Sequence, residues 1–120
     1  MIYVGTDIVQ TSRIDKMIQE KGDHFLSHIF STTEQDICNK KVSPSIHYSG
    51  KFAAKEAVKK AILSSKAVLI VPLTSIQIQN DMDGMPLVQI QIHGFDFKNL
   101  NVSISHAGDY AIATAILELK

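Results

Sequence analysis

The sequence predicts an α+β fold in which a small antiparallel sheet packs around one long central helix. The strongest observation is a continuous run of helix-forming residues over 51–62, where alanines leave little bulk on the helix surface. A second is the segment rich in β-branched and aromatic residues that starts the chain. A third is the second half of the chain, where polar and apolar residues alternate between turn formers. With 120 residues, the chain is expected to form one domain over 1–120.

Composition narrows the classes of function. The 12 basic and 12 acidic residues cancel to a formal net charge of zero, so no long-range field points to nucleic acid or an anionic membrane as a partner. The lone Cys38 excludes an intramolecular disulfide. The chain starts without the features of a signal peptide, and its longest apolar run, 67–71, is too short to span a bilayer. We therefore expect a soluble cytoplasmic protein.

The first strand, over residues 1–9, is expected to be buried, and Asp7 is the anomaly in it. A carboxylate among apolar neighbours is costly to bury unless a cation neutralises it, either a metal ion or a lysine. Gly5 leaves room for another backbone or a ligand to come close. The alternative is that Asp7 stands at the exit of the strand and caps the helix that follows.

The next segment is predicted to be a helix that starts at Thr11 or Ser12, runs to about Lys21 and stops at Gly22. Its core positions are Ile14, Met17 and Ile18. A short helix or turn is expected over 24–30. Ser31 and Glu34 then have the spacing of a capping box, which predicts another short helix to about residue 39.

The central helix is expected to begin near Ser45 or Ile46, and its alanines allow close packing against a strand. Glu56 precedes Lys60 by four residues, the order and spacing at which two side chains meet on one helix face. The simplest interpretation of that pair is a solvated ion pair, which contributes little to stability. Beyond the helix, 64–66 are expected to form a loop.

The second half predicts antiparallel strands. Alternating patterns over 75–79 and 87–92 flank a segment dense in turn formers, which predicts a hairpin. Residues 93–99 are expected to form a loop, followed by strands over 101–105 and 110–119. His106 stands at the exit of the third strand, where a turn residue and a ligand-binding residue are equally compatible with the sequence.

Four stretches in this order resemble the small bacterial holo-acyl-carrier-protein synthases, a type of 4′-phosphopantetheinyl transferase. A Gly-x-Asp at the end of the first strand is paired in that family with an aromatic-x-x-Lys-Glu-Ala-x-x-Lys helix. The fixed positions of that pattern are filled here by Phe52, Lys55, Glu56, Ala57 and Lys60. The other two stretches are the turn at 80–86 and the segment 103–106. The resemblance implies the 4′-phosphopantetheinyl transferase fold and transfer of phosphopantetheine from coenzyme A to a serine of an acyl carrier protein.

Transfer of phosphopantetheine to a serine requires that the charge on the phosphates of coenzyme A is neutralised and that the serine hydroxyl loses its proton. A hard divalent cation suits the first need, Mg²⁺ or alternatively Mn²⁺, and Asp7 and Glu56 are the expected ligands. Glu56 and Lys60 are the expected catalytic residues: Lys60 stabilises the phosphates or protonates the leaving group, and the proton goes to Glu56 or to a metal-bound water.

The resemblance also implies binding residues. Those expected to bind coenzyme A are Lys51, Lys55, Ser64, Pro86, Ser105 and His106. The helix over 11–21 is expected to present Arg13 and Met17 to the acidic recognition helix of the carrier. Small members of the family are homotrimers with the active site between subunits, and the same is expected here.

Two positions depart from the family pattern. A loop that is usually rich in glycine is replaced by Leu63, Ser64 and Ser65, and Met85 stands where a lysine is usual. These departures motivate the alternative of a weakened member that binds coenzyme A or a carrier domain without efficient transfer. A further alternative is an assembly subunit without coenzyme A, but a structural protein gains nothing from Asp7 in an apolar strand.

Overall fold

The computed structural model describes residues 1–120 and confirms the predicted α+β architecture. Its elements follow one another as β1 (Ile2–Gln10), α1 (Thr11–Lys21), α2 (Asp23–Ile29), α3 (Thr32–Asn39), α4 (Pro44–Ser65), the 3₁₀ turn η1 (Leu73–Ser75), β2 (Ile76–Asn80), β3 (Pro86–Ile90), β4 (Asn99–Ala107) and β5 (Tyr110–Glu118). No helix is both long and apolar enough to cross a membrane.

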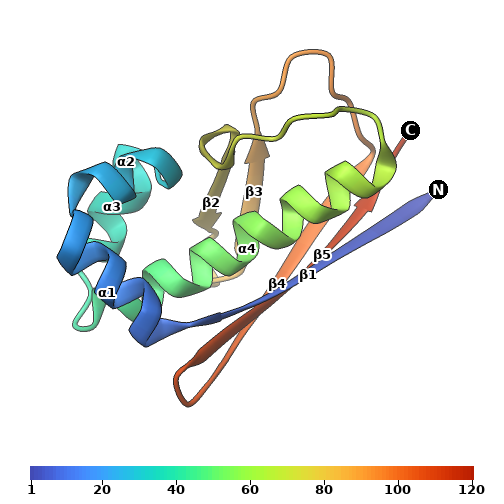
Figure 1. Ribbon diagram of the computed structural model, residues 1–120. Helices are drawn as coiled ribbons and strands as arrows, with labels where there is room; N and C mark the ends of the chain where they lie inside the picture. Colours follow the sequence, from blue (N-terminus) through green and yellow to red (C-terminus); the bar gives the residue numbers. More distant parts are fainter.

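The strands form two antiparallel sheets. The larger has the order β1-β5-β4, and the smaller is the β2-β3 hairpin that the alternating pattern predicted. Helix α4 lies along the larger sheet, and α1 to α3 gather at its first turns (Figure 1). In the hairpin, β2 packs against α4 and β3 lies next to β4. The central helix is therefore the element on which the rest of the chain packs.

Gly5 explains how closely β1 approaches α4. A Cβ added at this position would lie 1.9 Å from the carbonyl oxygen of Ala57 and 2.7 Å from the amide nitrogen of Ala61. No side chain larger than hydrogen fits there without moving the strand. The predicted role of Gly5, to let another backbone come close, is confirmed, and the contact holds Asp7 near the helix.

Only one face of β1 is buried, which corrects the prediction of a buried strand. The face toward α4 holds Gly5 and Asp7, whereas Ile2, Val4 and Ile8 on the other face are more than half exposed. Both faces of the strand carry apolar residues, so the sequence pattern alone did not show which face is buried. Burial is decided by α4, which covers one face only.

Two helix ends were predicted from local signals. The capping box is present, with Ser31 Oγ accepting from the amide of Glu34 and the Glu34 carboxylate accepting from the amide of Ser31. Gly22 ends α1 with a φ of +51°. Both predictions are confirmed, because each signal depends only on residues within one turn of the helix end.

Two boundaries differ from the predictions. Helix α4 continues through Ser64 and Ser65, which were expected in a loop, and ends at Lys66 in the left-handed conformation. The hydroxyls of both serines donate to backbone carbonyls one turn earlier and so accommodate these polar residues in the helix. Strand β4 extends through His106, because its pairing with β5 continues to Ala107 and Tyr110.

Candidate active site

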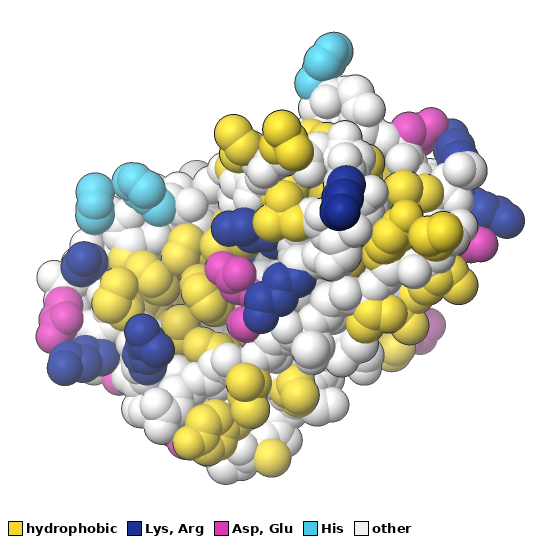
Figure 2. Space-filling view, turned by 45° about the vertical axis from the view of Figure 1, so that its right-hand side comes forward, with side chains coloured by type: hydrophobic (Ala, Val, Ile, Leu, Met, Phe, Trp, Pro, Cys, Tyr) yellow, Lys and Arg dark blue, Asp and Glu magenta, His cyan; other side chains and the backbone are white.

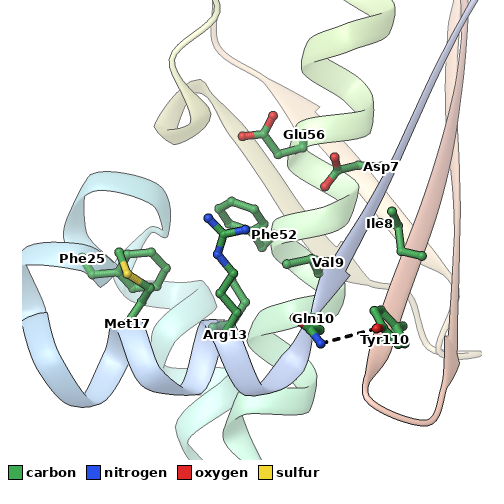
Figure 3. Close-up of a pocket in the computed structure, with 11 residues that line it drawn as sticks. Asp7, Ile8, Val9, Gln10, Arg13, Met17, Phe25, Phe52, Glu56 and Tyr110 are labelled. Atoms are coloured by element: carbon green, nitrogen blue, oxygen red, sulfur yellow. Dashed lines mark hydrogen bonds between the residues drawn. The ribbon is translucent and has the colours of Figure 1, made fainter.

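Asp7 and Glu56 meet at one cavity. Asp7 comes from β1 and Glu56 from the middle of α4, and both line a cavity of about 500 Å³. Figure 3 shows the two carboxylates side by side at one end of this cavity. The close approach of β1 to α4 at Gly5, two residues before Asp7, brings them together. We call this cavity the acidic cavity.

Lys60 pairs with Asp7. Its Nζ lies 3.0 Å from Asp7 Oδ1 and also donates to the carbonyl oxygen of Thr6 at 3.0 Å. Glu56 has no ion-pair partner, so the Glu56–Lys60 pair suggested by their spacing does not form. The alternative of Asp7 as a helix cap is also wrong, because the N-cap of α1 is Gln10 and no side chain of its own segment caps the helix. The cation that compensates Asp7 in this structure is therefore a lysine.

The remaining wall of the acidic cavity is largely apolar. Arg13 and Met17 of α1, the two residues expected to bind the carrier, both line it. The other lining residues, mostly apolar, are Ile8, Val9, Gln10, Ile14, Phe25, Phe52 and Tyr110. Figure 2 shows an apolar area on this face, with basic and acidic side chains at its border.

The donor set of the acidic cavity fits one hard cation held jointly by protein and substrate. No group of three or more His, Cys, Asp or Glu side chains surrounds a common point, so the chain offers no site that encloses a metal by itself. Asp7 and Glu56 supply two carboxylates beside open space. Mg²⁺ in phosphoryl-transfer sites takes one or two carboxylates and completes its octahedron with phosphate oxygens and water.

A second cavity, of about 770 Å³, holds three of the residues expected to bind coenzyme A, namely Lys51, Pro86 and His106. We call it the basic cavity, because Lys41 and His47 also line it. A Cβ added at Gly50 would lie 3.1 Å from Nε2 of His106, so this glycine leaves space for the imidazole. The two cavities share no lining residue.

Lys51 is buried at the wall of the basic cavity. Its Nζ donates to the carbonyl oxygen of Ile78 at 2.8 Å, the one hydrogen bond that its ammonium makes. Burial lowers the pKa of Lys51 from its ordinary value, because the charged form loses hydration. An anion in the cavity would offset that loss.

Lys55 lies elsewhere than expected. Its side chain is fully buried, and its Nζ contacts the carboxylate of Glu34 at 2.7 Å and the carbonyl oxygens of Ile29, Leu73 and Ile76. With every donor engaged inside the protein and neither cavity lined by it, Lys55 has no path to a phosphate. This placement does not fit the coenzyme A contact that the resemblance implied.

Ser64 and Ser105 line neither cavity. The Ser64 hydroxyl donates to the carbonyl oxygen of Lys60 on its own helix. Ser105 is exposed on β4 and precedes His106, so the two side chains point to opposite faces of the strand.

Sequence reasoning missed three residues of this region. Glu34 was identified only as a helix cap, although its carboxylate also accepts from the amide of Ile78 and binds Lys55. Lys41 and His47 of the basic cavity carried no signal, since single basic residues next to a helix start are common on surfaces.

Known proteins match along nearly the whole chain. A family described as the 4′-phosphopantetheinyl transferase superfamily matches residues 3–115. A holo-[acyl-carrier-protein] synthase of Protochlamydia amoebophila is 38% identical over 116 residues, covering 94% of each chain. A synthase of the same name from Thermodesulfovibrio yellowstonii is 36% identical, covering 95% of this chain and 96% of its own.

Solved structures agree with the fold. The complex of an ACPS with CoA from Chronobacterium ammoniagenes superposes with a TM-score of 0.86 at 27% identity, covering 100% of this chain and 98% of the other. The Helicobacter pylori holo-[acyl-carrier-protein] synthase in complex with coenzyme A gives a TM-score of 0.79 at 29% identity, covering 96% and 99%.

Proposed function

The chain belongs to the 4′-phosphopantetheinyl transferase superfamily, and we propose that it transfers phosphopantetheine from coenzyme A to a serine of an acyl carrier protein with the help of Mg²⁺. The relatives named as holo-[acyl-carrier-protein] synthases support this acceptor, and the neighbours solved with coenzyme A support this donor. The free Cys38 thiol is compatible with a cytoplasmic location, where thiols stay reduced.

The observation that carries the proposal is the meeting of Asp7 and Glu56 at the acidic cavity. Two carboxylates from different elements, with a lysine on one of them and open space beside both, form the protein half of a phosphate-bound magnesium site. Asp7 and Glu56 would hold Mg²⁺, which would neutralise charge on the phosphates of coenzyme A.

The residues of the chain supply the remaining chemistry. The serine oxygen of the carrier attacks the phosphorus next to pantetheine, a new P–O bond forms, and the bond from that phosphorus to the bridging oxygen breaks. Glu56 accepts the proton of the serine hydroxyl, because it has no ion-pair partner and faces the cavity. Lys60 places a positive charge beside Asp7, where it stabilises or protonates the leaving phosphate oxygen.

The basic cavity is the proposed site for the nucleotide part of coenzyme A. Lys51 and His106 provide cationic or hydrogen-bonding groups for phosphate, and Pro86 and Met85 provide apolar surface. This cavity shares no residue with the acidic cavity, so one molecule of coenzyme A that uses both could take them from two different subunits. We propose that the protein is a homotrimer, in which the basic cavity of one subunit faces the acidic cavity of the next.

An apolar sheet face supports self-association. On β1 and β5, Val4 lies opposite Ile116 and Ile8 lies opposite Ile112, and all four side chains are 43 to 63% exposed. The Thr6–Thr114 pair lies between them. Exposed apolar side chains that gather on one sheet face are characteristic of subunit interfaces. Ile8 of this face also lines the acidic cavity, so a subunit that packs there would lie next to that cavity.

Intact-mass spectrometry tests the proposal. Apo carrier proteins from fatty-acid synthesis and from specialised pathways are incubated with the protein, coenzyme A and Mg²⁺, in parallel with the Asp7→Asn and Glu56→Gln variants. The expected result is a mass gain of one phosphopantetheine that either substitution reduces at least a hundredfold. Asp36→Asn is the matched control, because this exposed carboxylate on α3 lines neither cavity.

A transfer rate that is unaffected by both substitutions would contradict the proposed site. Binding of coenzyme A without mass gain on any carrier would favour the weakened family member instead. In that case Met85, which lines the basic cavity in place of the usual lysine, is the first residue to revert.

A further inference from the structure

Helix α1 is capped by a residue from the other end of the chain. Its N-cap residue Gln10 makes no side-chain hydrogen bond to the helix, and its first turn holds no acidic residue. Asp109 takes both roles: its Oδ1 accepts from the amide of Ser12 at 3.0 Å, and its Oδ2 accepts from the Ser12 hydroxyl at 2.5 Å. The carbonyl oxygen of Asp109 accepts from the amide of Thr11 at 2.8 Å. Asp109 thus accepts from two backbone N–H groups that have no partner within α1, and it places a negative charge at the positive end of the helix dipole.

The hairpin between β4 and β5 fixes Asp109 in this position. Its loop has two residues, Gly108 and Asp109, and Gly108 adopts a φ of +57°, a conformation that favours glycine at the first position of a tight hairpin turn. Tyr110 is the next residue and pairs with Gln10 in the sheet. Its hydroxyl accepts a hydrogen bond from the side-chain amide of Gln10 at 3.4 Å. Residues 10–12 at the start of α1 are therefore hydrogen-bonded to residues 109 and 110 of the β4-β5 hairpin.

The residues next to these hydrogen bonds line the acidic cavity. Arg13 follows Ser12 directly, Met17 is one turn further along, and Tyr110 adjoins Asp109; all three line the cavity. A change in the first turn of α1 moves Arg13 first, because its backbone lies within the capped turn. Asp109 itself lines neither cavity, so it can act on docking only through α1.

We propose that Asp109 is a positioning residue that holds the first turn of α1, and Arg13 with it, in the orientation that binds the carrier protein. This inference rests on the proposed transferase function. It assigns Asp109 to affinity for the carrier and not to binding of coenzyme A or to the chemical step.

The test separates these three quantities. We expect Asp109→Ala to raise KM for the carrier about fivefold, the factor that corresponds to the usual effect of losing one helix cap. KM for coenzyme A and kcat are expected to stay within about twofold, a range well below that cap effect. Asp109→Asn is expected to recover part of the loss, because its amide oxygen still accepts from Ser12. Asp36→Ala is the control for removing an exposed carboxylate.

Two results would overturn the inference: an unchanged KM for the carrier in Asp109→Ala, or parallel changes in kcat and both KM values, which indicate a general loss of structure. Hydrogen exchange gives a readout without activity, since the Ser12 amide should exchange faster in Asp109→Ala than in the wild type. If the wild type transfers nothing, its affinity for apo carrier, measured by titration calorimetry, replaces KM. The expected fivefold weakening there upholds the inference, although the proposed function has failed, and an equal affinity overturns it.

Discussion

Lys55 and Glu34 form an ion pair in the interior, with 2.7 Å between Nζ and Oε1 and no exposed surface on either side chain. The pair joins α4 to the start of α3, and further hydrogen bonds connect it to α2, η1 and β2. Burial lowers the pKa of Lys55, whereas the hydrogen bond and charge of Glu34 raise it. Every buried polar side-chain atom in the protein has a partner, so this network is complete.

Lys55→Met is expected to destabilise the protein by about 3–5 kcal/mol, because it leaves the Glu34 carboxylate buried without its cation. Chemical denaturation measures the difference. The double variant Lys55→Met with Glu34→Gln should recover part of the loss, since the remaining amide is uncharged. A Lys55→Met protein as stable as the wild type would contradict the structural role assigned to the pair.

Gly5→Ala is expected to destabilise the protein by about 3 kcal/mol, at the upper end of the range for overpacking, because its Cβ would collide with the backbone of α4. Denaturant unfolding checks the value. Gly50→Ala is the comparison, since the atom nearest its Cβ is the movable end of the His106 side chain at 3.1 Å. Equal stability of the two variants would show that β1 yields easily.

Lys60→Met should slow transfer by about 10²–10³-fold, the usual effect of losing one charge that stabilises a transition state. Its stability should change by less than about 1 kcal/mol, because the pair with Asp7 is partly exposed. Single-turnover kinetics with saturating carrier gives the rate. Lys59→Met is the matched control, and a similar loss of rate in that variant would indicate a general effect of charge.

The contribution of Cys38 to stability is expected to fall as the pH rises from 9 to 11. Burial raises the pKa of the Cys38 thiol from 9.0 to about 11, so the unfolded chain ionises first and the stabilising difference is lost across this interval. Between pH 9 and 11 the stability of the wild type should therefore fall relative to that of Cys38→Ala, by about 2 kcal/mol near pH 11. Unfolding curves at a series of pH values provide the test, and parallel pH dependences in the two proteins would contradict it.

Mixing two inactive variants tests whether the active site lies between subunits. Asp7→Asn disables the acidic cavity and His106→Ala the basic cavity, so a mixed trimer restores sites in which both halves are native. Refolding the two together should recover a measurable fraction of wild-type transfer, whereas each alone stays inactive. Absence of recovery in mixed trimers, verified by native mass spectrometry, would place the site within one chain.

The sequence predicted those parts of the fold that depend on neighbouring residues. Gly22, the capping box at Ser31 and the alternating strands of the β2-β3 hairpin were all found at or near their expected positions. Asp7 was identified as a residue that needs a cation, and a cation is present. These features follow from local geometry or from the cost of burying one charge.

Partners between distant segments could not be predicted in the same way. Lys60 pairs with Asp7 and not with Glu56 four residues away, because β1 crosses α4 at this level. Lys55 and Glu34 both look like surface residues in the sequence, and only the packing of α3 and β2 on α4 encloses them. The separation of the candidate site into two cavities is likewise a property of the folded chain.

The absence of a shared residue between the two cavities has a consequence for how such a protein can diverge. Under the proposed function, substitutions on α1 around Arg13 would change the preferred carrier while Lys51 and His106 retained the same donor, since no side chain lines both cavities. Such a protein would then adapt to a new carrier through gradual change at one cavity, while the other cavity stayed the same.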